Sequence, residues 1–540
     1  MTEGAMARVE VRPGRLALAL SGALAVAAIT APALADTDRV VLAINPPTAE
    51  TNLFWAGGDW SSTGQAMEPL VGADPITGAF DNSRLAESWE NNADFTEWTF
   101  RLREGVPFHH GYGEVTAEDV VHSYALHTGA DVTLTAVEQM RGAEVTALDR
   151  YTVRFTFEDP RQNFLFLNGA RGSMYIYSKA QYDKEGLDGY NELMVGTGHY
   201  RFVERTAGRI LYERVEDHYS GIVPDFREME LRFVAEPATK LAMLLTGEAH
   251  IADLSHELMP DALDGGMEII QSVNPTMQTD IVFNGLYCTS GDPACRPDLP
   301  WADVRIREAI NRALDRETMA QVLFDGRAEI LVRHAMKEGH EGYDPTLEER
   351  FEDMYGYDPD RARELMAEAG YPDAFPDPTI PLVLTEIPGQ PEIPTQTELV
   401  QVYLEEVGFQ TEIREIDHAG VGAAGRGRQA YFLNPIRNAP IRPTEVAFRA
   451  FYTNPGGPYQ GWEDDWTEAK IQELIATRDP EARDGIAREI FNYLFEQYND
   501  IPLFEVHTEV AVNREVVAGW TFPGVTSAGI GHWHLIEAAN

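Results

Sequence analysis

Strand and helix patterns alternate along this chain, and this alternation limits its fold more than any other feature of the sequence. Residues 151–157 carry an apolar side chain at every second position, which is typical of a half-buried strand. Trp98, Phe100 and Leu102 repeat the same two-residue period, and residues 39–44 form a short apolar run that predicts a buried strand.

Helix start signals lie between these strands. Thr116 stands before acidic residues that would occupy the first turn of a helix, and Asp303 opens a segment whose apolar residues recur on one face. Asp358 is followed by Pro359 at the first helical position, and Gly370 would end that helix. Because strands and helices interleave and no repeat of about 20–50 residues is visible, the sequence predicts an α/β protein.

The N-terminal segment has the three parts of a cleavable export signal. Arg8, Arg12 and Arg15 form a positive region, residues 16–31 are small and apolar, and an Ala-Leu-Ala cleavage site follows. A membrane anchor needs about 20 apolar residues, and this run is shorter and ends at a proline. We therefore expect residues 1–35 to be a signal peptide and the mature protein, in a Gram-negative bacterium, to be periplasmic.

Charge excludes two classes of partner. The chain has 540 residues, with 43 Lys and Arg against 87 Asp and Glu, so its formal net charge is −44. Nucleic acid and anionic membranes would repel such a protein, and neither is expected as a partner. At 44% hydrophobic residues the chain has enough apolar material for a packed core, and its length suggests about three lobes.

The chain has two cysteines, Cys288 and Cys295, in a turn-rich stretch. Two cysteines cannot make a disulfide scaffold or a four-thiolate metal site. In an oxidising compartment they would close a small loop as a disulfide. Free thiols acting on a metal or as a nucleophile would need partner histidines, and none is close in sequence.

Residues 420–425 match the pattern G-x-G-x-x-G and follow a predicted strand at 411–416. A dinucleotide site would need a helix that opens directly at this turn and an acidic residue about 20 positions further on. Arg426, Gly427 and Arg428 follow instead. We interpret the glycine-rich segment as a flexible loop inside the later part of the chain.

Two histidine clusters occur, at His109-His110 and at His532-Trp533-His534. The second pair would lie on one face of a strand, as metal ligands can, but the sequence places no third or fourth ligand. We interpret these histidines as packed or solvated, and predict neither a metal site nor a cofactor. Motifs such as H-E-x-x-H, G-x-S-x-G and the P-loop are missing from the sequence, so nothing in it indicates an enzyme.

Several aromatic residues fall in stretches rich in Gly, Pro and Asn. Each one would ordinarily pack a loop onto the core, but together they suit a solute cleft with apolar walls and a few polar anchors. They are Trp55, Trp60, Tyr431, Phe448, Phe451, Trp462 and Trp466.

Six segments carry a family resemblance. They are LAESWE at 85–90, WTFRLREGVPFH at 98–109, VTAEDVV at 115–121, GTGHYRFV at 196–203, DVRIREAINRALD at 303–315 and YDPDRARELMAEAGYP at 357–372. In this order they resemble the family 5 extracellular solute-binding proteins of ABC importers, which include periplasmic dipeptide, oligopeptide and nickel binders. The fourth segment is similar to a family pattern that reads GTGPY.F.

The resemblance implies a periplasmic-binding-protein-like fold, a two-domain clam of type II, cluster C, with an extra third lobe. Domain I would hold residues 36–284 and 503–540, including the extra lobe at about 80–200, and domain II would hold 285–502. Closure around a peptide or small-molecule solute would present a surface to ABC transporter permease subunits. We expect a monomer without catalytic activity.

One segment of the sequence bears on the chemical class of the ligand. In the family's peptide binders an aspartate pairs with the α-ammonium of the peptide, and the resemblance places Ala439 at that position. Arg437, Asn438 and Arg442 would instead offer hydrogen-bond donors, and the planar fork of arginine suits a carboxylate. This predicts a carboxylate-bearing ligand with no obligatory free amine. Alternatively, these arginines pair with acidic residues of the protein, or the segment aligns elsewhere.

The resemblance places a first ligand-facing loop at residues 52–60. Trp55 and Trp60 would stack on the solute there, and Asp59 would serve as an anchor for a cation. His507, close to the second crossing between the domains, is a further candidate. Peptide binding therefore stays open.

Three function classes follow from the sequence. The first is a receptor for a peptide or small organic solute, and the second is a receptor for a nickel complex or metallophore, which the histidine clusters keep open. The third and remotest is an exported hydrolase. A nucleophile and base that converge in one cleft would favour the hydrolase, and metal analysis would identify the second class.

Overall fold

A computed structural model describes most of the chain after the predicted signal peptide, which itself lies outside the described residues. The described residues are 38–47, 50–53, 60–74, 76, 79–129, 132, 140–168, 174–371, 379–386, 392–438, 443–453, 461–522 and 532–539. Among them, no helix is both long enough and apolar enough to cross a membrane.

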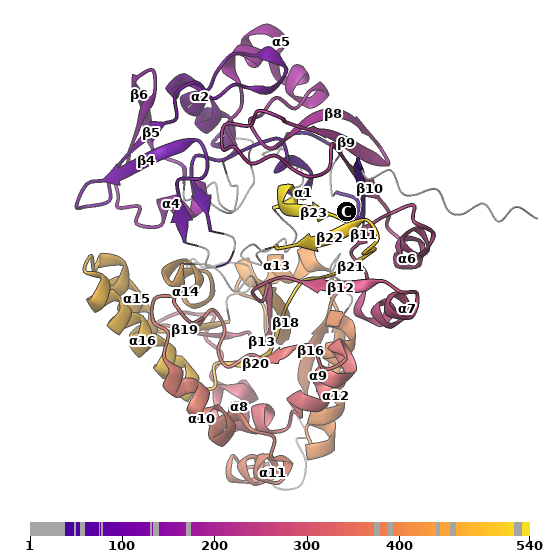
Figure 1. Ribbon diagram of the computed structural model, residues 1–540. Coiled ribbons are helices and arrows are strands. Elements are labelled where there is room, and N and C mark those ends of the chain that lie inside the picture. Colours follow the sequence, from indigo (N-terminus) through magenta and orange to yellow (C-terminus); the bar gives the residue numbers. More distant parts are fainter. Residues whose placement is uncertain are drawn as a thin grey trace, which may run out of the picture. The chain divides into compact units, whose positions relative to one another are not determined.

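The first large sheet has seven strands in the order β12-β21-β11-β1-β10-β9-β8 (Figure 1). Its strands are β1 (Arg39–Ile44), β8 (Tyr200–Thr206), β9 (Arg209–Arg214), β10 (Glu228–Phe233), β11 (Ile251–Ala252), β12 (Glu268–Gln271) and β21 (Glu509–Val512). β1 is parallel to both of its neighbours, β10 and β11. The strand predicted at residues 39–44 is confirmed as β1, whose central residues are buried.

Both faces of this sheet are covered. On one face, Val41 and Ala43 pack with residues of α6 (Pro237–Thr246) and α7 (Met259–Asp264). On the other, Val40 and Leu42 share a core with the C-terminal strands β22 (Val517–Trp520) and β23 (Ile536–Ala538). The alternating side chains of β1 thus serve two cores.

The second large sheet has six strands in the order β15-β20-β13-β18-β16-β17. Its strands are β13 (Met277–Phe283), β15 (Glu329–Ile330), β16 (Ile380–Leu384), β17 (Thr411–Glu415), β18 (Leu433–Asn438) and β20 (Asp500–Val506). The helices that share its core cluster are α8 (Val304–Arg312), α9 (Arg316–Phe324), α10 (Pro345–Tyr355), α11 (Pro359–Glu368), α12 (Glu392–Val407), α14 (Thr444–Tyr452), α15 (Asp465–Ala476) and α16 (Pro480–Glu496).

A third sheet, in the order β4-β5-β7-β6, has a core of its own and forms the extra lobe (Figure 1). Its elements are β4 (Ala86–Asn91), β5 (Glu97–Leu102), β6 (Glu144–Asp149), β7 (Thr152–Thr156), α2 (Ala117–His127) and α4 (Phe164–Asn168). The smaller elements of the molecule are α1 (Trp60–Thr63), α5 (Lys179–Glu192), β2 (Gly72–Ala73), β3 (Phe80–Asp81), β14 (Leu286–Cys288) and β19 (Trp462–Asp464). Sheets and helices interleave as predicted, and the α/β fold with an extra lobe is confirmed.

The predicted helix starts are confirmed. Thr116 and Asp119 form a capping box at α2, in which the Thr116 amide donates to Asp119 Oδ2 at 2.8 Å. Asp303 and Asp358 accept hydrogen bonds from backbone amides in the first turns of α8 and α11. Gly370, just after α11, has a φ of +103°, a conformation that glycine adopts readily.

The flexible loop predicted at residues 420–425 is wrong, because this segment is helical. It lies within α13 (His418–Arg426), where the Asp417 side chain accepts a hydrogen bond from the Gly420 amide at 2.6 Å. Val421 is buried against Val383 and Phe432. The N-cap and this packing offset the poor helix propensity of glycine, and the glycines form no phosphate-binding turn.

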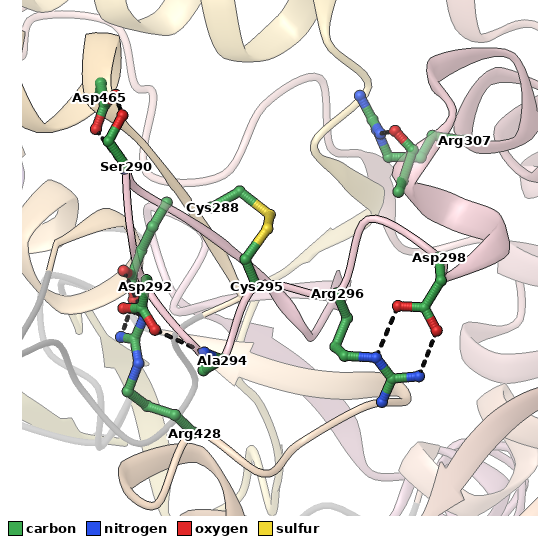
Figure 2. Close-up of a disulfide and its surroundings, with 12 residues drawn as sticks. Cys288, Ser290, Asp292, Ala294, Cys295, Arg296, Asp298, Arg307, Arg428 and Asp465 are labelled. Carbon is green, nitrogen blue, oxygen red and sulfur yellow. Dashed lines mark hydrogen bonds and ion pairs between the residues drawn. A yellow bond between two sulfur atoms is a disulfide. The ribbon is translucent and has the colours of Figure 1, made fainter.

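The predicted disulfide between Cys288 and Cys295 is confirmed (Figure 2). The loop that it closes follows β14 and is held from two sides. The Ser290 amide donates to Asp465 Oδ1 at 2.8 Å, and Arg428 Nη2 donates to Asp292 Oδ2 at 2.5 Å. The bridge closes the loop, and these two contacts hold the loop on α15 and on a residue that follows α13.

Candidate functional site

The chain passes between the two large sheets twice, at residues 272–276 and 507–508. The two connections are hydrogen-bonded to each other, and we call the pair the hinge. The Ser272 amide donates to the Thr508 carbonyl at 2.9 Å, and the hydroxyls of Thr276 and Thr508 are 2.6 Å apart. The two sheets are thus joined by one paired two-stranded link.

The hinge differs from the domain division predicted at 284/285 and 502/503. That division assigns β13 to the first domain, whereas β13 pairs with β18 and β20 of the second sheet. All seven β13 residues are buried, because this strand lies inside the second sheet. The strand pairing separates the two sheets a few residues outside the predicted boundaries.

His507 lies in the hinge itself. Its Nδ1 bonds to the Ser272 carbonyl oxygen at 2.7 Å, which links the two connections. Its Nε2 is 3.8 Å from Glu329 Oε1, on β15 of the second sheet. In this arrangement the imidazole is part of the hinge.

Both predicted ligand-facing segments leave their sheets at the hinge edge. On the first sheet, Ala43 of β1 pairs with Ala252 of β11, which pairs with Ala511 of β21. The end of β1 therefore lies beside the start of β21, which directly follows the hinge. On the second sheet, Gln278, just after the hinge, pairs with Asn438 at the end of β18. The segments after β1 and after β18 therefore begin on either side of the hinge.

Asn52 shows how the first of these segments is held. Arg205, near the hinge end of β8, donates to the Asn52 side chain at 2.7 Å. Asn52 also donates to the Asn191 carbonyl at 2.7 Å. The chain leading into the predicted binding loop is thus anchored on the first sheet.

Arg437 is the predicted ligand residue that the structure places beside the hinge. It lies in β18 opposite Thr279. Burial lowers the pKa of its guanidinium, and the carboxylate of Glu392 at the start of α12 opposes this effect. A half-buried positive charge with an acidic neighbour thus lies near the hinge edge of the second sheet.

Tyr431, the other predicted site residue whose side chain the structure describes, lies away from this group. Tyr431 comes just before β18. The first residue of β18, Leu433, pairs with Phe283, which is the last residue of β13 and lies at the end of that strand away from the hinge. The Tyr431 ring lies under the Arg296 guanidinium, with 5.0 Å between its centroid and Cζ. The remaining predicted residues are not described. Trp55, Asp59 and Arg442 lie entirely outside the described residues, and for Trp60 and Asn438 the side chains do.

A cavity on the first sheet is lined by histidines that sequence reasoning did not bring together, and we call it the histidine cavity. Its lining includes Gln65, Glu68, Arg84, His199, Tyr200, His532 and His534. The register of β8, β9, β10 and β1 places Arg201, at the start of β8, in line with Arg39, at the start of β1. The part of the cavity beside the start of β8 thus lies at the end of the sheet opposite the hinge.

The predicted strand for His532 and His534 is wrong. His532 has a φ of +56°, and a 3-10 turn follows at Trp533–Leu535. The two rings are 5.8 Å apart, and His534 stacks on His199 instead. The packed interpretation of His109 is confirmed, because its Nε2 bonds to the Gly198 carbonyl oxygen at 2.9 Å inside the core.

Glu68 is the buried acid of this cavity and was missed from the sequence. Its Oε1 accepts from Arg84 at 2.8 Å, and its Oε2 accepts from Thr197 at 2.9 Å and from Tyr219 at 2.8 Å. One sequence signal was available, because His199 stands where the similar family pattern has a proline. The partners of Glu68 come from distant segments, which no local pattern connects.

Comparison with known proteins agrees with this architecture. The chain is 28% identical over 314 residues to heme-binding protein A of Haemophilus influenzae, a match that spans 54% of each protein. It is 24% identical over 468 residues to the glutathione-binding protein GsiB of Salmonella typhimurium, covering 81% of this chain and 83% of the relative. The structure of HbpA2 from Haemophilus parasuis matches with a TM-score of 0.75 at 19% identity, over 93% of this chain and all of that one.

The fold, the paired hinge and these similarities point to one family. The family model described as bacterial extracellular solute-binding proteins, family 5 Middle, matches residues 82–458, which is more than half of the chain. The chain belongs to the family 5 bacterial extracellular solute-binding proteins.

Proposed function

We propose that this protein is a periplasmic receptor of an ABC importer, which captures a peptide or small organic solute and delivers it to the membrane permease. The observation that carries the proposal is the family match together with the hinge edge, where both predicted ligand-facing segments begin. Removal of residues 1–35 on export would leave the mature receptor, which we propose acts as a monomer without catalysis.

Closure about the hinge would provide the mechanism. The two sheets carry separate cores and are joined by two hydrogen-bonded connections, so one rotation moves each sheet as a body. Solute that contacts both sheets binds the closed form more tightly than the open form, and this difference drives closure. The permease would then recognise the closed form.

Arg437 supports an acidic group on the solute. Its guanidinium lies in β18 beside the hinge, where burial lowers its pKa although the carboxylate of Glu392 acts in the opposite direction. A carboxylate would supply a charge-assisted, two-pronged hydrogen bond to the guanidinium. A ligand with a carboxylate and no required free amine is therefore our proposed solute class, and a peptide satisfies it through its C-terminus.

The experiment is to identify what the protein carries. The protein is purified from the periplasm under native conditions and then denatured, and the released small molecules are identified by mass spectrometry. We expect a peptide or organic acid that, added back at 100 times its Kd, stabilises the protein by about 2.7 kcal/mol. A released compound that fails to stabilise the stripped protein, or dipeptides that stabilise it while acidic compounds without an amine do not, would contradict the proposed solute class.

A nickel complex is the second candidate, because one solved structure of similar fold, NikZ from Campylobacter jejuni, is in complex with Ni(L-His). Elemental analysis of the same released fraction distinguishes it from an organic solute. A nickel content near one equivalent, released together with an organic chelator, would favour this candidate.

A further inference from the structure

Three imidazoles are stacked beside the histidine cavity, and two of them, His199 and His534, line it. The ring centroids of His199 and His218 are 3.8 Å apart, and those of His199 and His534 are 3.9 Å apart with a 6° angle between the rings. His199 precedes β8, His218 follows β9, and His534 lies near the C-terminus. The fold therefore gathers three segments that are distant in sequence.

Burial disfavours the positively charged form of all three rings. Burial lowers the pKa of His218, and lowers that of His199 and His534 well below the ordinary value. The neighbouring imidazoles act in the same direction on His199, because one protonated ring would repel another at this distance. Neutral imidazole is the form that binds metal ions.

A carboxylate completes the group. Glu68, His199 and His218 are all buried, and each offers one ligand atom such that the three atoms lie within 4.8 Å of one another. Two imidazole nitrogens and one carboxylate oxygen form a donor set that suits Zn²⁺ and its neighbours Co²⁺ and Ni²⁺. We propose that Glu68, His199 and His218 bind a divalent transition-metal ion at the histidine cavity.

The groups around Glu68 would orient it for this role. Tyr219 and Thr197 donate to Oε2, which leaves Oε1 to face a cation, and Arg84 now occupies that side. Hydrogen bonds to a ligating carboxylate fix its orientation and raise metal affinity. The ion would therefore displace Arg84 from Oε1 while the two donors to Oε2 stay in place.

Binding requires a small convergence of the ligands. Bonds of about 2.1 Å to a tetrahedral ion place ligand atoms about 3.4 Å apart, so separations of up to 4.8 Å must close by up to about 1.4 Å. His218 donates from Nε2 to the Thr197 carbonyl at 2.9 Å, and it must exchange this bond or turn. The His199 ring is hydrogen-bonded to Ser220 Oγ at 3.2 Å, a longer contact than the 2.9 Å bond of His218 Nε2, so we expect the His199 ring to move more easily.

The location separates this site from solute capture. His199 lies next to the start of β8, at the edge of the first sheet opposite the hinge. An ion bound there would join the chain before β8 to the chain after β9 and to the segment after α1, all on one side of the hinge. The expected effect is stabilisation of the first domain.

Cobalt is the probe, because its visible spectrum reports coordination. The full mature protein is treated with a chelator, dialysed and titrated with Co²⁺, and Zn²⁺ is then added as competitor. We expect one equivalent of Co²⁺ with a four- or five-coordinate spectrum that Zn²⁺ abolishes. His199→Gln and His218→Gln should each weaken binding at least tenfold, whereas the control His418→Gln, at an exposed position on α13, should leave it unchanged.

Two results would overturn the proposal, namely no saturable Co²⁺ binding to the wild-type protein or unchanged binding by His199→Gln. His218 makes structural hydrogen bonds through both ring nitrogens, so the unfolding temperature of each variant is measured, and His199→Gln decides the outcome if His218→Gln does not fold. Solute binding is measured on the same samples. A His199→Gln variant that loses Co²⁺ but keeps solute shows that the two sites are separate.

Discussion

His127 ends α2 with an imidazole that is fully buried. Its Nδ1 bonds to the Ser123 carbonyl oxygen at 2.8 Å, but burial dominates and lowers the pKa to about 4. In the unfolded chain this pKa is about 6.5. The folded protein therefore binds fewer protons, and the contribution of His127 to stability is present above about pH 6.5 and is lost as the pH falls towards 4.

The pH dependence of unfolding measures this effect. Between pH 7.5 and pH 5 the wild-type protein should lose about 2 kcal/mol more of its free energy of unfolding than His127→Gln, which has no titrating ring. The exposed His418→Gln variant should follow the wild-type curve. Parallel curves for wild type and His127→Gln would show that the buried imidazole is not the cause.

Arg437 gives a prediction about binding. If its guanidinium holds a carboxylate of the solute, Arg437→Gln should weaken binding roughly 10- to 100-fold, because a hydrogen bond to a charged group contributes about 1.5–3 kcal/mol. Arg437→Lys keeps the charge and should lose less. The exposed Arg363→Gln on α11 is the matched control, and titration calorimetry is the measurement. Unchanged affinity in Arg437→Gln would favour the alternative in which Arg437 only pairs with Glu392.

Residues of the candidate site were predicted unevenly. Arg437 was singled out because its segment aligns with the family's ligand segment, and the strand pairing places it near the hinge. Its contact with solute stays a prediction. Glu68 and His218 were missed, because a buried charge network depends on contacts across more than a hundred residues of chain. Neither residue has a local signal that separates it from an ordinary surface acid or histidine.

At the scale of elements, the loop closed by Cys288 and Cys295 is the clearest target (Figure 2). With a sequence separation of 7, the chain-entropy model assigns this bridge about 2.5 kcal/mol. The double variant Cys288→Ala, Cys295→Ala should therefore unfold roughly 5–10 °C lower in a thermal scan.

Ser290→Ala is the control for this experiment. It removes one hydroxyl contact to Asp465 within the same loop and keeps both the bridge and the amide contact of residue 290. A shift of about 2 °C or less is expected for this exposed contact. Equal shifts for the two variants would assign the stabilisation to the contact with α15 and not to the bridge.

Helices with polar caps were predictable because the signal is local, as at Thr116, Asp303 and Asp358. The helix α13 was missed because its glycines suggested a loop, although Asp417 provides the same kind of cap. The turn at Trp533 was missed because two residues of the same type at alternate positions also fit a strand. Local patterns thus predicted elements well where a cap was recognised and poorly where composition was the only guide.

At the scale of the whole molecule, the fold depends on pairings that no local pattern contains. β1 pairs with β10 across 189 residues of chain, and β13 pairs with β20 across more than two hundred. The α/β class followed from interleaved patterns, whereas the two-domain arrangement came only through the family resemblance. The hinge itself, at 272–276 and 507–508, became visible only from the strand order.

The central claim is that solute brings the two sheets together about this hinge, and a distance across the hinge tests it most directly. Val203 on β8 of the first sheet and Val402 on α12, a helix that packs with the second sheet, are exposed. Cysteines placed there can carry spin labels while the native disulfide stays closed. With the co-purified solute at saturation, pulsed electron resonance should show one shorter distance than in the stripped protein. An unchanged distance distribution at saturating solute would contradict capture by closure.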